Sequence, residues 1–214
     1  MVPALMMCAL QILLLQTPDG SIKLDRPLPV AWTDYVMQYD DGTAYWMAFA
    51  GSVRGVWFNA EDFYGGGISE LLVNHLEFWF YHHASYPWDT QFFYAELWNG
   101  DDASGPSALL DQTSVTAAHY APCYANYPSP ILTEADIWGL VNTEMSTGGW
   151  PSTLGDNTPN TVNHSYYMSD EYVWTPWIVQ GPTANDFLIR ADGAPPGWDL
   201  GQSTWGSIKG LYCR

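Results

Sequence analysis

The stretch that decides the fold runs from residue 71 to residue 98. Its first half reads Leu71-Leu72-Val73-Asn74-His75-Leu76-Glu77-Phe78-Trp79-Phe80-Tyr81. The period is two, so Leu76, Phe78 and Phe80 fall on one face of a strand. After a turn-rich segment, the run from Gln91 to Trp98 repeats the pattern with Phe93, Ala95 and Leu97. The alternation predicts two strands whose apolar faces lie in the core.

The second face of each strand is also aromatic, and it carries carboxylates. If the two strands are antiparallel neighbours, these side chains share one surface. They are His75, Glu77, Trp79, Tyr81, Tyr94, Glu96 and Trp98. Flat indole and phenol rings bury the C–H faces of sugars while their polar edges stay in water. This face is therefore either a carbohydrate-binding platform or a surface covered by more protein.

The rest of the chain also consists of short aromatic or β-branched runs between Gly, Pro, Asn and Asp. No long window has a helical period, so we expect an all-β fold, an antiparallel sandwich that is jelly-roll-like. At 214 residues the chain suits one such domain, which we place at residues 35–193. We expect an irregular lead-in at 17–34, one long loop at 147–163 and a short C-terminal tail at 194–214.

The charge balance limits the partners. The chain has 23 acidic and 6 basic residues and a net charge of −17. Phosphate backbones require clustered Lys and Arg, so DNA and RNA are poor partners. Neutral polymers, cationic ligands and calcium remain compatible, and so does a plain solvated surface.

The N-terminal residues 1–16 form an apolar run that is too short to span a bilayer. The run is typical of a secretory leader, although no basic residue precedes it, and a buried first element is the alternative. We therefore expect a secreted or cell-surface protein without a membrane span in its mature chain. In an exported chain, Cys123 and Cys213 are candidates for one disulfide.

Oxygen ligands at the turns make structural calcium a candidate, because calcium takes roughly six to eight of them. Asp101 and Asp102, in a predicted hairpin tip, are the best placed. Asp and Asn also favour turns for local hydrogen bonding, and no twelve-residue EF-hand spacing is present.

Glycoside hydrolysis is the remaining enzymatic hypothesis, because it needs two carboxylates about 5–10 Å apart. Glu77 and Glu96 meet this need only if they face each other across neighbouring strands. The adjacent His82 and His83 would point to opposite faces of a strand and could not chelate one ion. No nucleophile elbow or phosphate-binding loop is found.

Several short motifs together resemble a loosely defined group of secreted bacterial β-sandwich proteins known from environmental genomes. The matching stretches are Tyr39-Asp40-Asp41-Gly42-Thr43, Gly55-Val56-Trp57-Phe58, Leu97-Trp98-Asn99-Gly100-Asp101-Asp102, Asp186-Phe187-Leu188-Ile189-Arg190-Ala191 and Ser203-Thr204-Trp205-Gly206-Ser207-Ile208-Lys209. The resemblance implies export, a jelly-roll-like fold and a non-enzymatic surface role, and it implies no ligand.

We therefore expect a non-catalytic extracellular module that acts in surface attachment or carbohydrate binding. The alternative is a structural protein of the cell surface, in which the same aromatic side chains are buried between protomers. Solvent exposure of Trp79 and Trp98 separates these two hypotheses.

Overall fold

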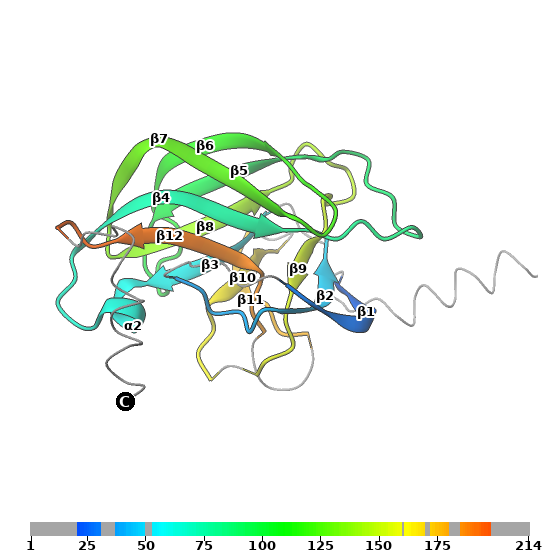
Figure 1. The fold of residues 1–214 in the computed structure, drawn as a ribbon, viewed down its shortest axis with the longest axis horizontal. Helices are drawn as coiled ribbons and strands as arrows, with labels where there is room; N and C mark the ends of the chain where they lie inside the picture. Colours follow the sequence, from blue (N-terminus) through cyan, green and yellow to red (C-terminus); the bar gives the residue numbers. More distant parts are fainter. Residues whose placement is uncertain are drawn as a thin grey trace, which may run out of the picture.

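Antiparallel strands dominate the fold, and they form three sheets (Figure 1). The computed structural model describes residues 21–30, 37–49, 53–159, 161–169, 172–179 and 185–197. The largest sheet has six strands in the order β11-β10-β3-β8-β5-β6. Their bounds are Trp174–Pro176, Ser165–Met168, Val53–Asn59, Asp136–Asn142, Phe92–Asn99 and Ala108–Thr116.

A three-stranded sheet packs face to face against the large one. Its order is β12-β4-β7, with bounds Ile189–Ala194, Glu70–Trp79 and Pro122–Glu134. Phe78 of β4 and Phe80, which follows the strand, lie 5.3 and 4.8 Å from Phe93 of β5, measured between ring centroids. These rings belong to the main core, which fills the space between the two sheets. The expected all-β antiparallel sandwich is therefore confirmed.

The third sheet has the order β1-β2-β9, with bounds Ser21–Pro29, Thr43–Ala48 and Thr153–Gly155. It packs against the end of β4 through a second apolar cluster that includes Met47, Leu154 and Trp79. The short helix α2 (Ala60–Tyr64) follows β3, and the side chain of Asn59 caps it by accepting a hydrogen bond from Glu61 N. No helix among the described residues has the length and apolarity needed to cross a membrane.

Three segments differ from the expectation. The lead-in at 17–34, expected to be irregular, contains β1, and the long loop at 147–163 contains the buried strand β9. Strand β7 is not evident from the sequence pattern, because Pro122, Pro128 and Pro130 interrupt it. Among the described strands β7 pairs only with β4, and an edge strand tolerates the missing N–H of proline. The leader at 1–16 and residues 198–214 of the tail lie outside the described residues.

Candidate functional site

The two strands that decide the fold are not neighbours. Strand β4 pairs with β12 and β7, whereas β5 pairs with β6 and β8 in the other large sheet. Their apolar faces meet across the core, so their second faces point away from each other on opposite sides of the sandwich. The seven side chains expected on one surface are therefore divided between two surfaces. Alternation predicts which face of a strand is buried, but it does not say which strands pair.

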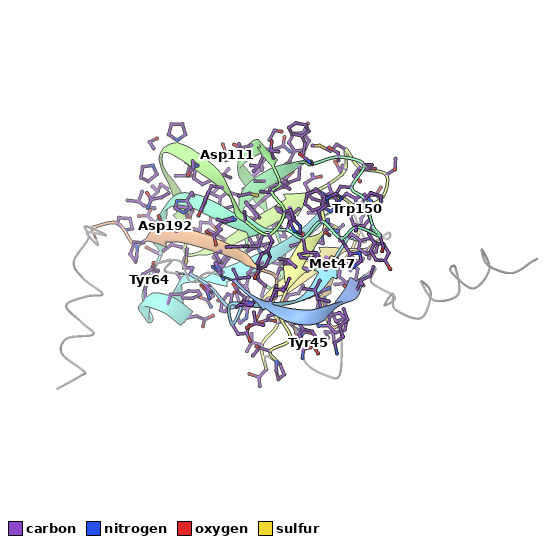
Figure 2. The ribbon with its side chains drawn as sticks, turned by 45° about the vertical axis from the view of Figure 1, so that its right-hand side comes forward. Tyr45, Met47, Tyr64, Asp111, Trp150 and Asp192 are labelled. Carbon is purple, nitrogen blue, oxygen red and sulfur yellow. The ribbon has the colours of Figure 1, made fainter. Side chains whose placement is uncertain are left out.

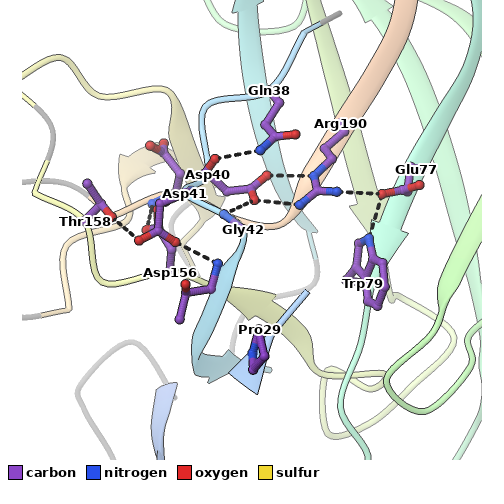
Figure 3. A network of polar contacts seen from close by, with 12 residues as sticks. Pro29, Gln38, Asp40, Asp41, Gly42, Glu77, Trp79, Asp156, Thr158 and Arg190 are labelled. Atoms are coloured by element: carbon purple, nitrogen blue, oxygen red, sulfur yellow. Dashed lines mark hydrogen bonds and ion pairs between the residues drawn. The ribbon is translucent and has the colours of Figure 1, made fainter. Parts of the chain in front are cut away.

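The β4 half of the expected platform is covered. Trp79 is only 4% exposed, because the third sheet packs over it. Glu77 is fully buried, and its Oε1 accepts hydrogen bonds from Trp79 Nε1 at 2.6 Å and from Arg190 Nη1 at 3.1 Å. Arg190 also binds the buried carboxylate of Asp40, with Nη2 to Oδ1 at 2.8 Å (Figure 3). This buried network is a structural element and presents no stacking surface.

His75 and Tyr81 lie on the β4 side of the sandwich but take no part in the buried network of Glu77 and Arg190. His75 Nδ1 lies 3.5 Å from the Asp192 carboxylate, and its ring meets the edge of Tyr124. Tyr81 follows the end of β4 and is half-buried at the loop end of the sandwich. The proposed catalytic pair of Glu77 and Glu96 also fails geometrically, because the two side chains lie on opposite outer faces.

The β5 half of the expected platform remains together. Tyr94, Glu96 and Trp98 alternate with the core residues Phe93, Ala95 and Leu97, so they occupy the outer face of the six-stranded sheet. Tyr94 is 36% exposed and Trp98 is half-buried. Strand geometry spaces these three side chains by about 7 Å from one to the next.

Glu96 organises this surface. Its Oε2 accepts a hydrogen bond from Trp98 Nε1 at 2.8 Å. Its Oε1 accepts from Gln112 Nε2 and from Asn142 Nδ2, both at 2.8 Å. Gln112 and Asn142 come from the flanking strands β6 and β8, so one carboxylate fixes the side chains of three strands. The indole of Trp98 is thereby held in one orientation.

Sequence reasoning missed the tryptophans next to Trp98. Trp138 of β8 is in register with Trp98 on one side and with Trp57 of β3 on the other, so three indoles form a row across the sheet. Tyr166 and Trp174 extend the cluster, with ring centroids 5.1 and 5.3 Å from that of Trp138. The period-two spacing on each strand was visible in the sequence, but the strand order that joins them was not.

The cluster is largely buried beneath its outer members. Trp138 is fully buried, and Trp57 and Tyr166 are nearly so, whereas Trp98 and Trp174 are half-buried. Trp57 Nε1 donates to Asp136 Oδ1 at 3.1 Å. Partly exposed rings of this face therefore lie on both sides of the buried cluster, at Tyr94 and Trp98 of β5 and at Trp174 of β11.

The expected calcium ligands lie beside this cluster. Asp101 Oδ1 accepts a hydrogen bond from Ser104 N at 2.6 Å, and Asp102 accepts one from the Tyr166 hydroxyl. Burial, with Asp102 nearby, raises the pKa of the Tyr166 phenol, which therefore keeps its proton and donates. No group of three or more His, Cys, Asp or Glu side chains suited to a metal occurs among the described residues. Structural calcium stays a prediction.

Comparison with known proteins adds no further constraint. No family model, curated protein or solved structure matches the chain. The function is therefore inferred from the residues and their geometry alone.

Proposed function

We propose that this chain is a non-catalytic extracellular module that binds neutral carbohydrate on the outer face of β5, β6 and β8. We call this face the Trp98 surface, and it consists of Tyr94, Glu96, Trp98, Gln112 and Asn142. The observation that carries the proposal is the hydrogen bond from Trp98 Nε1 to the Glu96 carboxylate. The side-chain amides of Gln112 and Asn142 donate to the same carboxylate and hold it in place. A stacking ring held in one orientation loses little side-chain entropy when a ligand binds.

The charges around this surface favour an uncharged ligand. The net charge of −17 repels anions, and Glu96 is the only acidic or basic residue (Asp, Glu, Lys, Arg or His) among the five. Both of its oxygens already accept hydrogen bonds, so Glu96 serves to position its neighbours and is not left open for a cation. The phenol of Tyr94 and the amide of Gln112 are exposed, and they suit the hydroxyls and C–H faces of a sugar.

Binding is favoured over hydrolysis for a geometric reason. A glycosidase needs a second carboxylate about 5–10 Å from the first, on the same side of the substrate. Glu77, the partner expected from the sequence, lies on the opposite side of the sandwich and is engaged by Arg190. The proposal therefore assigns no catalytic residue.

The test is intrinsic tryptophan fluorescence of the full chain, titrated with hydroxyethyl cellulose, xyloglucan, galactomannan and dextran. Trp98→Ala and Tyr94→Ala should each weaken binding about tenfold, the equivalent of one aromatic contact of about 1.4 kcal/mol. Tyr124→Ala is the matched control, because Tyr124 is 37% exposed against 36% for Tyr94 but lies on β7.

The outcomes discriminate between the two hypotheses. Saturable binding that Tyr94→Ala and Trp98→Ala weaken, and Tyr124→Ala does not, supports carbohydrate binding at this surface. If wild-type protein binds none of the four polysaccharides but self-associates with loss of Tyr94 exposure, the proposal is wrong and the assembly role takes its place. Circular dichroism of each variant shows whether the fold is intact.

A further inference from the structure

Four connecting segments meet at the loop end of the sandwich, and none of the aromatic rings that they carry belongs to the Trp98 surface. They follow β2, follow β4, join β6 to β7, and join β8 to β9 (Figure 1, right-hand end). Tyr120 N donates to Phe80 O at 2.8 Å, and Tyr81 N donates to Ser152 O at 3.3 Å, so backbone hydrogen bonds hold these segments together. Figure 2 labels Trp150 at this end.

Rings from all four segments form an unbroken chain of contacts, which we call the loop-end string. Its members, in order, are Trp150, Phe49, Tyr86, His83, Tyr81 and His119. Successive ring centroids lie 4.6, 6.3, 5.2, 6.4 and 4.8 Å apart. His119 is exposed and the other five side chains are half-buried. Unlike the cluster around Trp138, this string keeps part of every ring at the surface.

Hydrogen bonds fix the loops that carry the string. Asp89, in the loop after β4, accepts from Ser146 Oγ at 2.7 Å and from Thr147 N at 3.1 Å in the loop after β8. Trp150 N donates to Ser146 Oγ at 2.9 Å, so the backbone of Trp150 is joined to the same pair of loops. The rings are therefore arranged before any ligand arrives, which lowers the entropic cost of binding.

The two histidines of the string have a defined hydrogen-bonding role. Ser85 N donates to His83 Nδ1 at 3.1 Å, and His82 N donates to His119 Nδ1 at 3.0 Å. A neutral imidazole that accepts at Nδ1 carries its proton on Nε2. Each ring thus presents an Nε2–H donor beside the apolar faces of Tyr81 and Tyr86.

We infer that the loop-end string is a second binding site for a neutral, polyhydroxylated ligand, a sugar chain. Ring faces supply stacking, and the two Nε2–H groups donate to hydroxyl or ring oxygens of the ligand. The inference rests on residues separate from the Trp98 surface, so either site can exist without the other. Two sites on one module would raise its avidity for a long polymer.

The chemistry of the string disfavours charged ligands. None of its six residues is Lys, Arg, Asp or Glu, so the string itself offers an anion no fixed positive charge, and the net charge of −17 opposes its approach. The nearby carboxylate of Asp89 is already used by Ser146 and Thr147, and imidazole N–H donors face a cation unfavourably. Both Nδ1 atoms accept backbone hydrogen bonds, which removes them as metal ligands.

The experiment is isothermal titration calorimetry of the full chain with the same four polysaccharides, which gives the Kd for each. Trp150→Ala and Tyr86→Ala should each weaken binding about tenfold, and His83→Phe, which keeps a ring and removes the donor, should weaken it several-fold. Tyr172→Ala is the control, because Tyr172 is 84% exposed and lies outside both surfaces. Long-range ¹H–¹⁵N NMR spectra of the imidazoles give a second readout: the probe should shift Nε2 of His83 and His119.

Each result separates this inference from the function proposed above. Weakened binding in the string variants, with shifted Nε2 resonances, supports the second site whether or not Trp98→Ala also has an effect. Weakened binding in Trp98→Ala alone, with unshifted imidazoles, overturns the second site and leaves the Trp98 surface. No binding by wild-type protein to any of the four polysaccharides overturns both. If Trp150→Ala lowers the melting temperature, the Tyr86→Ala variant and the NMR shifts still show whether the second site exists.

Discussion

Arg190 shows how a single residue can hold separate parts of this fold together. Its guanidinium is fully buried and joins Asp40, which precedes β2, to Glu77 of β4. Arg190→Met should lower the free energy of unfolding by about 3–5 kcal/mol, because two buried carboxylates lose their cation. Urea denaturation monitored by circular dichroism measures this loss.

A milder change in the same network provides the control. Glu77→Gln keeps an oxygen acceptor for Trp79 Nε1, so it should cost only about 1–3 kcal/mol. If Arg190→Met and Glu77→Gln lower the free energy of unfolding equally, the uncompensated charge of the buried carboxylates is not the main cause of the loss in Arg190→Met.

Asp156 makes the stability depend on pH. Burial raises the pKa of the Asp156 carboxyl from 3.8 to about 8, and the negative charges of Asp186 and Asp41 also raise it. Hydrogen bonds from the backbone N–H groups of the same two residues lower this pKa, but they do not offset the rise. The folded chain therefore holds this proton more tightly than the unfolded chain does. Its stabilising contribution is fully present below pH 3.8 and is lost as the pH rises towards about 8.

Asp156→Asn tests this linkage. The asparagine cannot titrate, so the free energy of unfolding should fall less steeply between pH 5 and about 8 than it does in wild-type protein. Urea denaturation at several pH values gives both slopes. Identical slopes would show that Asp156 is ionised in the folded chain throughout this range.

At the scale of elements, β9 is placed by a close contact that only glycine allows. A Cβ atom on Gly155 would lie 2.1 Å from Cη2 of Trp177, whose ring stacks on Phe187. Gly155→Ala should therefore cost about 1–3 kcal/mol through overpacking. Gly66→Ala is the matched control, since the nearest heavy atom to its Cβ is 3.8 Å away. Thermal melts of both variants measure the difference, and equal melting temperatures would refute the prediction.

The elements also show what the sequence could and could not supply. The core faces of β4 and β5 followed from alternation, and so did the common face of Tyr94, Glu96 and Trp98. The pairing of β5 with β8 did not follow, because alternation is local whereas pairing joins residues about 40 positions apart. The loop-end string was beyond prediction for the same reason: its rings come from connections that only the topology brings together.

At the scale of the whole molecule, the net charge of −17 opposes compactness through self-repulsion. Raising NaCl from 10 to 200 mM should therefore raise the melting temperature, by roughly 2–4 °C for each 1 kcal/mol gained. Differential scanning calorimetry measures the shift. A melting temperature independent of salt would mean that the charges are too widely spaced to matter.

The same measurement with CaCl2 at matched ionic strength tests the calcium prediction. A rise beyond that in NaCl, lost in Asp101→Asn and Asp102→Asn, would support calcium at the hairpin tip. Equal rises in melting temperature in both salts would mean that charge screening accounts for the whole effect, and would refute a specific calcium site.

The contact between Trp138 and Trp174 has an optical consequence. Their ring centroids are 5.3 Å apart and their planes are inclined by 39°, so their electronic transitions couple in a chiral arrangement. Trp174 belongs to the short outermost strand β11, whereas Trp138 lies within the sheet. The far-ultraviolet circular dichroism of this protein should therefore carry an exciton contribution from this pair that is lost when β11 detaches, reporting on that edge without an added label.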